Sequence, residues 1–315
     1  MIGGLEASSA IPATNRACVA PATRSESAGE MNMKFGTFIT SVKPERIATH
    51  VRAAEDLGVE SAWIGEHMIL PVASESKYPY SPDGRFPAPA DVPFHDPMLA
   101  LTYAAALTSK IRLATGIFVV PLRNAIATAK AVASLDVLSH GRVIFGVGVG
   151  WWAEEFAMVG APFKDRALRT REYLELMKEL WTSDDPVYRG KTIAVEGVRF
   201  YPKPIQKPHP PIVVGGTSEL ALKRTVRYGD GWYGIAKSLD ESRALIGRLR
   251  ELERAAHRAK PVEITLSLRT GYPITLDDVK RLGEMGVDRA LVGMPLRAFS
   301  EDELARFHDE VMTRI

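Results

Sequence analysis

Glycines in the middle of the chain form the first pattern that could do chemistry. The apolar residues 143–145 lead into Gly146, Gly148 and Gly150, and a segment rich in tryptophan and glutamate follows. Because glycine has no Cβ, a flat ligand can lie against the backbone where a strand ends in this way. The same pattern is also found where strands simply pack closely, so the run alone leaves both interpretations open.

A second glycine site follows a later apolar segment. Residues 212–214 end in Gly215 and Gly216, and Thr217 or Ser218 is a natural N-cap for the helical pattern that comes next. The free N–H groups of a first helical turn bind phosphate well, although a plain strand-to-helix turn would also contain glycine. A platform for a flat ring and a cradle for a phosphate together predict a flavin-type cofactor.

A neighbouring glutamate and histidine offer acid–base chemistry. Glu66 and His67 follow the short β-type run 61–65. Histidine ordinarily has a pKa near neutrality, which makes His67 our candidate for the catalytic group that supplies or accepts a proton. A histidine that only hydrogen-bonds the cofactor is the alternative. Glu66 could orient the imidazole, contact the ring of the cofactor, or form a salt bridge with no catalytic role.

The composition is that of a globular protein with a sizeable core. Of the 315 residues, 46% are hydrophobic and 25% are charged. The net charge is +2 and no cluster of lysine and arginine stands out, so nucleic acid is not an expected partner. Cys18 is the single cysteine, which fits a reducing cytoplasm. No apolar run approaches the roughly 20 residues of a membrane helix, and we assign no metal ligands.

The first thirty residues differ from the rest. Residues 1–30 are rich in alanine, serine, threonine and proline, show no periodicity and lack the apolar core of a signal peptide. We expect this segment to be a disordered N-terminal extension, which an upstream start codon would explain if Met31 or Met33 were the natural start. The folded domain is expected to run from residue 31 to residue 315.

From Met33 onward, short β-type runs alternate with amphipathic helical segments. The predicted strands are 34–39, 61–65, 111–119, 143–147, 212–214, 231–235, 263–268 and 289–292. Eight strand–helix units in about 285 residues are what a single-domain α/β barrel, the (β/α)8 TIM barrel, requires. A doubly wound open sheet is the alternative. In a barrel, both glycine sites and the Glu66–His67 pair would lie at the C-terminal ends of strands, where TIM barrels place their active sites.

Two insertions interrupt the alternation, one after the second strand and one before the fifth. Residues 69–95 contain six prolines together with Tyr78, Tyr80 and Phe86. We expect them to lie over the barrel mouth as a lid or substrate wall, with a surface loop or dimer contact as the alternative. Residues 187–201 have the pattern of a β-hairpin, and a proline-rich segment then leads to the fifth strand.

Four stretches, in their order and spacing, resemble the bacterial luciferase-like flavin and deazaflavin oxidoreductases. They are 61–67 (Ser-Ala-Trp-Ile-Gly-Glu-His), 111–124, 141–156, and 202–216 with its Pro-Lys-Pro and Pro-Pro-Ile-Val-Val-Gly-Gly sequences. The resemblance runs from about residue 34 to the C-terminus. It implies a TIM barrel, a homodimer, and a cofactor that is FMN or coenzyme F420, a 5-deazaflavin.

Within this family, the short lid, the Glu66–His67 pair and the sequence Trp-x-x-Glu-Glu-Phe look closest to the coenzyme F420-dependent branch. That branch has a cis non-proline peptide bond on a bulged third strand, which the resemblance places between Gly116 and Ile117. The cofactor-binding residues that the resemblance implies are Glu66, Thr115, Gly116, Ile117, Gly148, Val149, Gly150, Trp151, Glu154, Gly215, Gly216 and Thr217.

The chain departs from this branch at two positions. The sugar-phosphate dehydrogenases of the branch have a glutamate that acts as an acid after the last glycine of the fourth-strand motif, where this chain has Trp151. A sugar phosphate substrate is therefore in doubt. Glu154 stands where that subgroup has an asparagine near the polar edge of the ring, which leaves the role of Glu154 open.

Three functions remain compatible with the sequence. The first is a coenzyme F420-dependent oxidoreductase that transfers hydride between the deazaflavin C5 and a small apolar substrate. The second is an FMN-dependent luciferase-like monooxygenase that uses O2 and a partner reductase. The third is a protein that binds a flavin or deazaflavin without turnover, an idea to which Trp151 in place of an acid gives weight.

Overall fold

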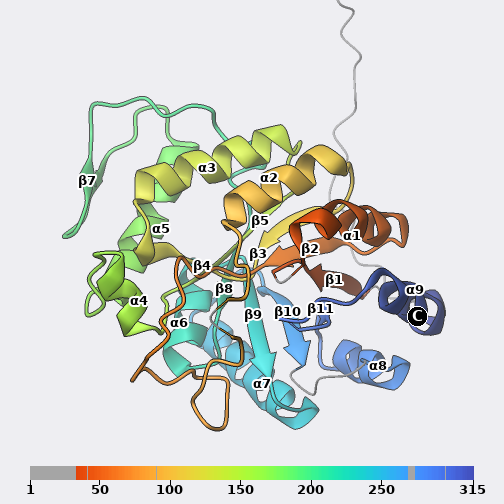
Figure 1. Cartoon of the computed structure of the whole chain (residues 1–315). Coiled ribbons are helices and arrows are strands. Elements are labelled where there is room, and N and C mark those ends of the chain that lie inside the picture. Colours follow the sequence, from red (N-terminus) through yellow and green to blue (C-terminus); the bar gives the residue numbers. More distant parts are fainter. Residues whose placement is uncertain (1–32, 41, 90, 269–273, 295) are drawn as a thin grey trace, which may run out of the picture. The chain divides into compact units, whose positions relative to one another are not determined.

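Parallel strands arranged in a closed ring form the centre of the protein. The computed structural model describes residues 33–40, 42–89, 91–268, 274–294 and 296–315, so the expected disordered extension, residues 1–30, lies outside the described part of the chain. The strands of the ring are β1 (Lys34–Phe38), β2 (Ser61–Ile64), β3 (Arg112–Thr115), β4 (Phe118–Val119), β5 (Val143–Gly148), β8 (Ile212–Gly215), β9 (Gly231–Ala236), β10 (Glu263–Leu268) and β11 (Arg289–Val292). They follow one another in the order β3-β2-β1-β11-β10-β9-β8-β5, and β5 pairs with β3 to close the ring. The predicted TIM barrel is confirmed (Figure 1).

Helices alternate with the strands along the chain and surround them (Figure 1). They are α1 (Pro44–Asp56), α2 (Pro97–Leu107), α3 (Ala125–Leu138), α4 (Ala153–Met158), α5 (Arg166–Thr182), α6 (Glu219–Tyr228), α7 (Leu239–Ala255), α8 (Leu276–Glu284) and α9 (Glu301–Glu310), with short 3-10 turns η1 (Val120–Leu122) and η2 (Met312–Arg314). In α1, Ile47, Val51 and Ala54 recur at helical spacing and are buried, which is why the period predicted a helix. No helix in the described ranges is both long and apolar enough to cross a membrane.

The third predicted strand, 111–119, is interrupted in the structure. Gly116 and Ile117 separate β3 from β4, and the peptide bond between them is cis, as the resemblance implied. β4 then pairs with β5, with Phe118 opposite Val147. The predicted strand 111–119 is therefore interrupted at these two residues, which form the bulge that the resemblance placed here and which line the mouth of the barrel.

Both insertions lie where the sequence placed them. Residues 69–95 follow β2 without a regular element of their own among the residues that the structure describes. The predicted hairpin is confirmed by β6 (Tyr188–Arg189) and β7 (Ala194–Val195), which pair in antiparallel fashion before β8.

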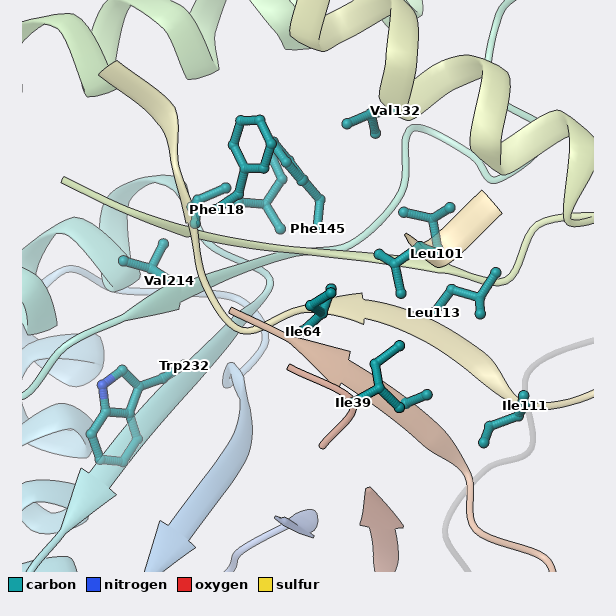
Figure 2. Close-up of a cluster of buried hydrophobic side chains, with 14 of the residues drawn as sticks. Ile39, Ile64, Leu101, Ile111, Leu113, Phe118, Val132, Phe145, Val214 and Trp232 are labelled. Carbon is teal, nitrogen blue, oxygen red and sulfur yellow. The ribbon is translucent and has the colours of Figure 1, made fainter. Parts of the chain in front are cut away.

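Alternating side chains of the strands build two apolar layers. Ile39 and Val214 pack between the strands and the helices (Figure 2). Their sequence neighbours Phe38 and Val213 belong instead to a smaller cluster that includes Trp63 and fills the inside of the barrel. Successive residues of a strand point to opposite faces, so each strand contributes to both layers.

Charged groups close the N-terminal end of the barrel. Arg289, at the start of β11, is fully buried and donates to both carboxylate oxygens of Glu60 at 2.7 Å. It also pairs with Glu263 at the start of β10 and donates to the Thr265 hydroxyl at 3.0 Å. A ligand site must therefore lie at the opposite end, above the C-terminal ends of the strands.

Candidate active site

A cavity of about 290 Å³ lies at the C-terminal ends of β2, β5, β8 and β9, with lid residues on one side. Most of the residues that the sequence predicted for the site line it: Glu66, His67, Gly116, Ile117, Gly148, Val149, Gly150, Trp151, Gly215, Gly216 and Thr217. Tyr78, Tyr80 and Phe86 from the insertion 69–95 also line it, as expected of a lid. Thr115 and Glu154 do not line the cavity.

Ile117 explains two of the glycines. A Cβ on Gly148 would overlap the Ile117 Cδ1 atom, and a Cβ on Gly215 would lie 2.6 Å from the Ile117 Cγ2 atom. These glycines therefore make room for the Ile117 side chain, which itself lines the cavity. The predicted platform is present, but an isoleucine on a bulge covers part of the glycine backbone.

Thr115 supports the bulge from behind. Its side chain is buried, and its hydroxyl donates to the Gly146 carbonyl at 2.6 Å. Because that hydroxyl is turned towards β5, Thr115 contacts no part of the cavity. The resemblance placed Thr115 among the cofactor-binding residues, and in the structure its side chain supports the bulge and does not line the cavity.

One end of the cavity is suited to an anion. Ser218 is the N-cap of α6, its hydroxyl accepting from the Ala221 N–H at 3.2 Å, as one of the two predicted candidates. Thr217 and Gly216 precede it, and Arg224 lies on the same helix facing the cavity. Burial lowers the pKa of Arg224, and the nearby Arg166 guanidinium lowers it further.

Arg224 makes no ion pair with a carboxylate among the residues that the structure describes. A half-buried cation without a counter-ion, next to a helix N-terminus, is the arrangement that binds phosphate. The sequence did not single out Arg224, which lies in the helical pattern that follows Ser218. Arg224 comes three residues after Ala221, so both lie on the same face of the helix, and both line the cavity. This helical spacing was the signal that could have identified Arg224.

Two tyrosines add hydroxyl groups that the sequence did not single out as ligands. Tyr233 on β9 is buried and lines the cavity, and its hydroxyl has no hydrogen bond within the described residues. The Ser267 hydroxyl lies near enough to influence the pKa of Tyr233 but does not meet hydrogen-bond geometry. Burial raises the pKa of Tyr233 and raises that of Tyr80, on the lid, to about 12. Both phenols stay protonated and can donate to a ligand.

His67 lies at the other end and is held by Glu155. The His67 Nδ1 atom is 3.0 Å from Glu155 Oε2, and Glu155 Oε1 accepts from the Met68 N–H at 2.7 Å. Four aromatic rings surround the imidazole at centroid distances between 4.9 and 6.2 Å: Phe86, Phe94, Trp151 and Trp152. With Nδ1 occupied and water largely displaced by rings, Nε2 is the nitrogen left for a substrate.

Glu66 does not orient His67. Its Oε1 accepts from Arg123 Nε at 2.6 Å and its Oε2 from the Val119 N–H at 2.6 Å, and Arg123 also pairs with Asp96 at 2.7 Å. Burial raises the pKa of Glu66 to about 7, while Arg123 and the Val119 N–H act in the opposite direction. Of the roles considered for Glu66, the salt bridge is the one observed.

Glu154 fastens the lid. Its carboxylate accepts from the Ser76 hydroxyl at 2.6 Å and from the backbone N–H groups of Glu75 at 2.6 Å and Ser76 at 3.1 Å. The Ser76 hydroxyl bond lowers the pKa of Glu154 to about 2. The neighbouring Trp152 indole donates to the Ser74 hydroxyl at 2.7 Å. The resemblance placed Glu154 among the cofactor-binding residues with its role left open, and in the structure its side chain bonds to the lid and does not line the cavity.

Trp151 gives the His67 end an apolar wall. Its ring stacks on Trp152 at a centroid distance of 4.6 Å and meets the lid rings of Tyr78 at 5.2 Å and Phe86 at 5.9 Å. No lysine or arginine other than Arg224 is among the described residues that line the cavity. Arg224 follows β8, and His67 follows β2, with β3 and β5 between them in the ring.

The match to known proteins agrees with this architecture. The family model of the luciferase-like monooxygenases matches residues 22–302. The chain belongs to the luciferase-like monooxygenase family. Members of this family are oxidoreductases, and both F420-dependent and FMN-dependent enzymes occur among the relatives.

Relatives within the luciferase-like family differ in what is known of them. An uncharacterised protein of Mycobacterium tuberculosis is 34% identical over 286 residues, 90% of this chain and 99% of the relative. F420-dependent glucose-6-phosphate dehydrogenase of Amycolatopsis mediterranei is 28% identical over 73% of this chain and 66% of the relative. FMNH2-dependent dimethylsulfone monooxygenase of Pseudomonas putida is 30% identical over 46% of this chain and 40% of the relative.

A solved structure shares the fold. Coenzyme F420-dependent tetrahydromethanopterin reductase from Methanopyrus kandleri has a TM-score of 0.71 with this protein, covering 90% of this chain and 99% of its own. The two sequences are 20% identical, so this likeness concerns the barrel alone.

Proposed function

We propose that this luciferase-like protein is a coenzyme F420-dependent oxidoreductase that transfers hydride between the deazaflavin C5 and a small apolar organic substrate. One observation carries the proposal: a single cavity joins an anion-binding end, at Arg224 and the start of α6, to the part-buried His67, which Glu155 holds. The similarity to the F420-dependent relative covers 73% of the chain, against 46% for the FMNH2-dependent relative, which is why F420 is placed before FMN.

The residues present fit a phosphorylated deazaflavin. Arg224, which pairs with no carboxylate among the described residues, and the N-terminus of α6 would hold the phosphate. The Tyr233 hydroxyl, buried and without a hydrogen bond to any described residue, would donate to a polar atom of the bound molecule. Ile117 and the backbone of residues 148–150 would lie against the flat ring.

A bound deazaflavin supplies or accepts a hydride, so the protein must provide position and one proton. His67 is placed for that proton transfer because Glu155 occupies Nδ1 and leaves Nε2 as the free ring nitrogen. The surrounding aromatic rings exclude water from the imidazole, which limits loss of the proton to solvent.

The substrate end is suited to an apolar molecule. Trp151 stands where an acid would serve a sugar phosphate, and the lysine- and arginine-free wall around His67 offers no partner for a second phosphate among the described residues. We therefore infer that the substrate differs from that of the glucose-6-phosphate dehydrogenase. The variant Trp151→Glu should gain no activity towards sugar phosphates, because a carboxylate alone would not bind the phosphate.

Titration with both cofactors tests the proposal. Quenching of tryptophan fluorescence should give tighter binding of coenzyme F420 than of FMN. Hydride transfer to or from apolar carbonyl compounds, alcohols and activated alkenes is then followed anaerobically at the deazaflavin absorbance. Tight binding of FMN without binding of F420, together with O2 consumption in the presence of a flavin reductase, would establish the monooxygenase instead. Binding without turnover across such a panel would favour a non-catalytic protein.

We also propose that the protein forms a homodimer through α2 and α3, which lie side by side (Figure 1). The outward face of α2 exposes Leu99 by 73% and Tyr103 by 49%, and Ile126 at the start of α3 is 40% exposed. Apolar side chains gathered on adjacent helices are typical of surfaces that another subunit covers. Light scattering of the Leu99→Asp variant should report a monomer, and an unchanged mass would contradict this interface.

A further inference from the structure

Glu155 makes two hydrogen bonds, and both concern the position of His67. Its side chain is 2% exposed and extends from the first turn of α4 to the end of β2. Oε2 lies 3.0 Å from His67 Nδ1, and Oε1 accepts from the Met68 N–H at 2.7 Å. One carboxylate therefore holds the imidazole and the backbone that follows it.

No other group of the described residues could take over this task. The four rings around His67 present edges and faces, which restrict the imidazole sterically but do not select one of its nitrogens. Glu66, the adjacent carboxylate, is engaged with Arg123 and the Val119 N–H. The negative charge of Glu155 is also close enough to raise the pKa of Glu66.

An ionised carboxylate only accepts hydrogen bonds, so a bond to Nδ1 requires the proton to be on Nδ1. The other nitrogen, Nε2, then carries the lone pair in the neutral ring or the transferable proton in the charged ring. Without the carboxylate, the ring is free to place its proton on either nitrogen and to rotate about its side-chain bonds.

We propose that Glu155 is the positioning residue of this site: it fixes the tautomer and the orientation of His67 so that Nε2 faces the substrate. The consequence for turnover rests on the proposed function of His67, whereas the effect on the imidazole does not. Glu154 and Glu155 are adjacent on one helical turn and have different partners. Glu154 binds the lid, and Glu155 binds the acid–base group.

The test compares Glu155→Gln with Glu154→Gln, its neighbour on the same turn. Nitrogen-15 NMR of histidine-labelled, cofactor-free protein reports which nitrogen of neutral His67 carries the proton, with His67→Ala identifying the signal. In the wild type the proton should be on Nδ1. Glu155→Gln should give a mixture of both forms, whereas Glu154→Gln should keep the wild-type pattern. With a substrate, Glu155→Gln should lower kcat by about 10²-fold and leave the cofactor Kd within a few-fold.

Several outcomes would overturn the inference. A wild-type His67 with its proton on Nε2 contradicts it directly, which matters if Glu155→Gln fails to fold. An unchanged tautomer in Glu155→Gln, or an altered tautomer with wild-type kcat, also contradicts the positioning role. If the wild type binds no F420, the proposed function fails, yet the NMR comparison still decides what Glu155 does. Recovery of the Nδ1 proton in Glu155→Asp, with partial recovery of kcat, would support it.

Discussion

Replacement of Arg224 by methionine tests the anion-binding end of the cavity. Methionine keeps an unbranched side chain but removes the charge and every donor. In the free protein the change should cost little stability, because Arg224 pairs with no carboxylate of the described residues and stands near the Arg166 guanidinium. The substitution should therefore act almost entirely on the affinity for the cofactor.

The size of the effect follows from the lost contact. A hydrogen bond to a charged group contributes about 1.5–3 kcal/mol, and each 1.4 kcal/mol is a tenfold change in Kd. Arg224 is half-buried, so solvent screens part of its charge. We therefore take a loss in the lower part of the energy range, which corresponds to a rise of about 10- to 30-fold in the Kd of the phosphorylated cofactor.

Lys223→Met supplies the matched control. Lys223 is the preceding residue of α6, is exposed, and pairs with Glu219 at 3.3 Å. Fluorescence titration should show a near-normal Kd for this variant. A phosphate-free flavin or deazaflavin should bind wild type and Arg224→Met alike. Equal losses in both variants, or an equal loss for the phosphate-free ligand, would refute the assignment of Arg224 to the phosphate.

Three further variants address the rest of the site. His67→Ala should leave cofactor affinity within a few-fold but lower turnover by about 10²–10⁴-fold, and near-normal kcat would make the histidine structural. Gly148→Ala should lower the melting temperature because its Cβ overlaps Ile117, an overpacking that costs about 1–3 kcal/mol, and adding Ile117→Ala should restore it. The lowered pKa of Glu154 means that lid fastening is present above the ordinary carboxyl range and is lost as pH falls from about 4.5 towards 2. The protection of amides in residues 69–89, measured relative to their intrinsic exchange rates, should therefore fall over that interval, and Glu154→Gln should show the loss of protection at neutral pH. Equal protection of the lid would contradict the fastening by Ser76.

The order of barrel elements was predictable because each strand and helix carries its own period in the sequence. The break at Gly116 and Ile117 was not visible in the same way. Gly116 is a local hint, since a glycine inside a strand often marks a bulge, but it was the family resemblance that placed the break within the run 111–119. The interruption depends on space beside Gly148 and Gly215, which lie far away in the sequence.

The local motifs of the site could be predicted from the sequence, but the side chains that pair with one another across the site could not. Glu66 is the sequence neighbour of His67, but successive residues at a strand end point to opposite sides, so Glu66 meets Arg123 and a helix supplies Glu155. Glu154 and Glu155 likewise point in different directions because neighbours on a helix are rotated about its axis. Which carboxylate meets which element depends on packing between distant segments, which a single sequence does not reveal.

The contact of Ile117 with two glycines has a consequence for how the family diversifies. The bulge, β5 and β8 contribute to one small volume, so the size of the residue at 117 and the absence of side chains at 148 and 215 depend on one another. A descendant that gains alanine at 148 must first, or simultaneously, shorten residue 117. Sequences should therefore change at these positions in concert.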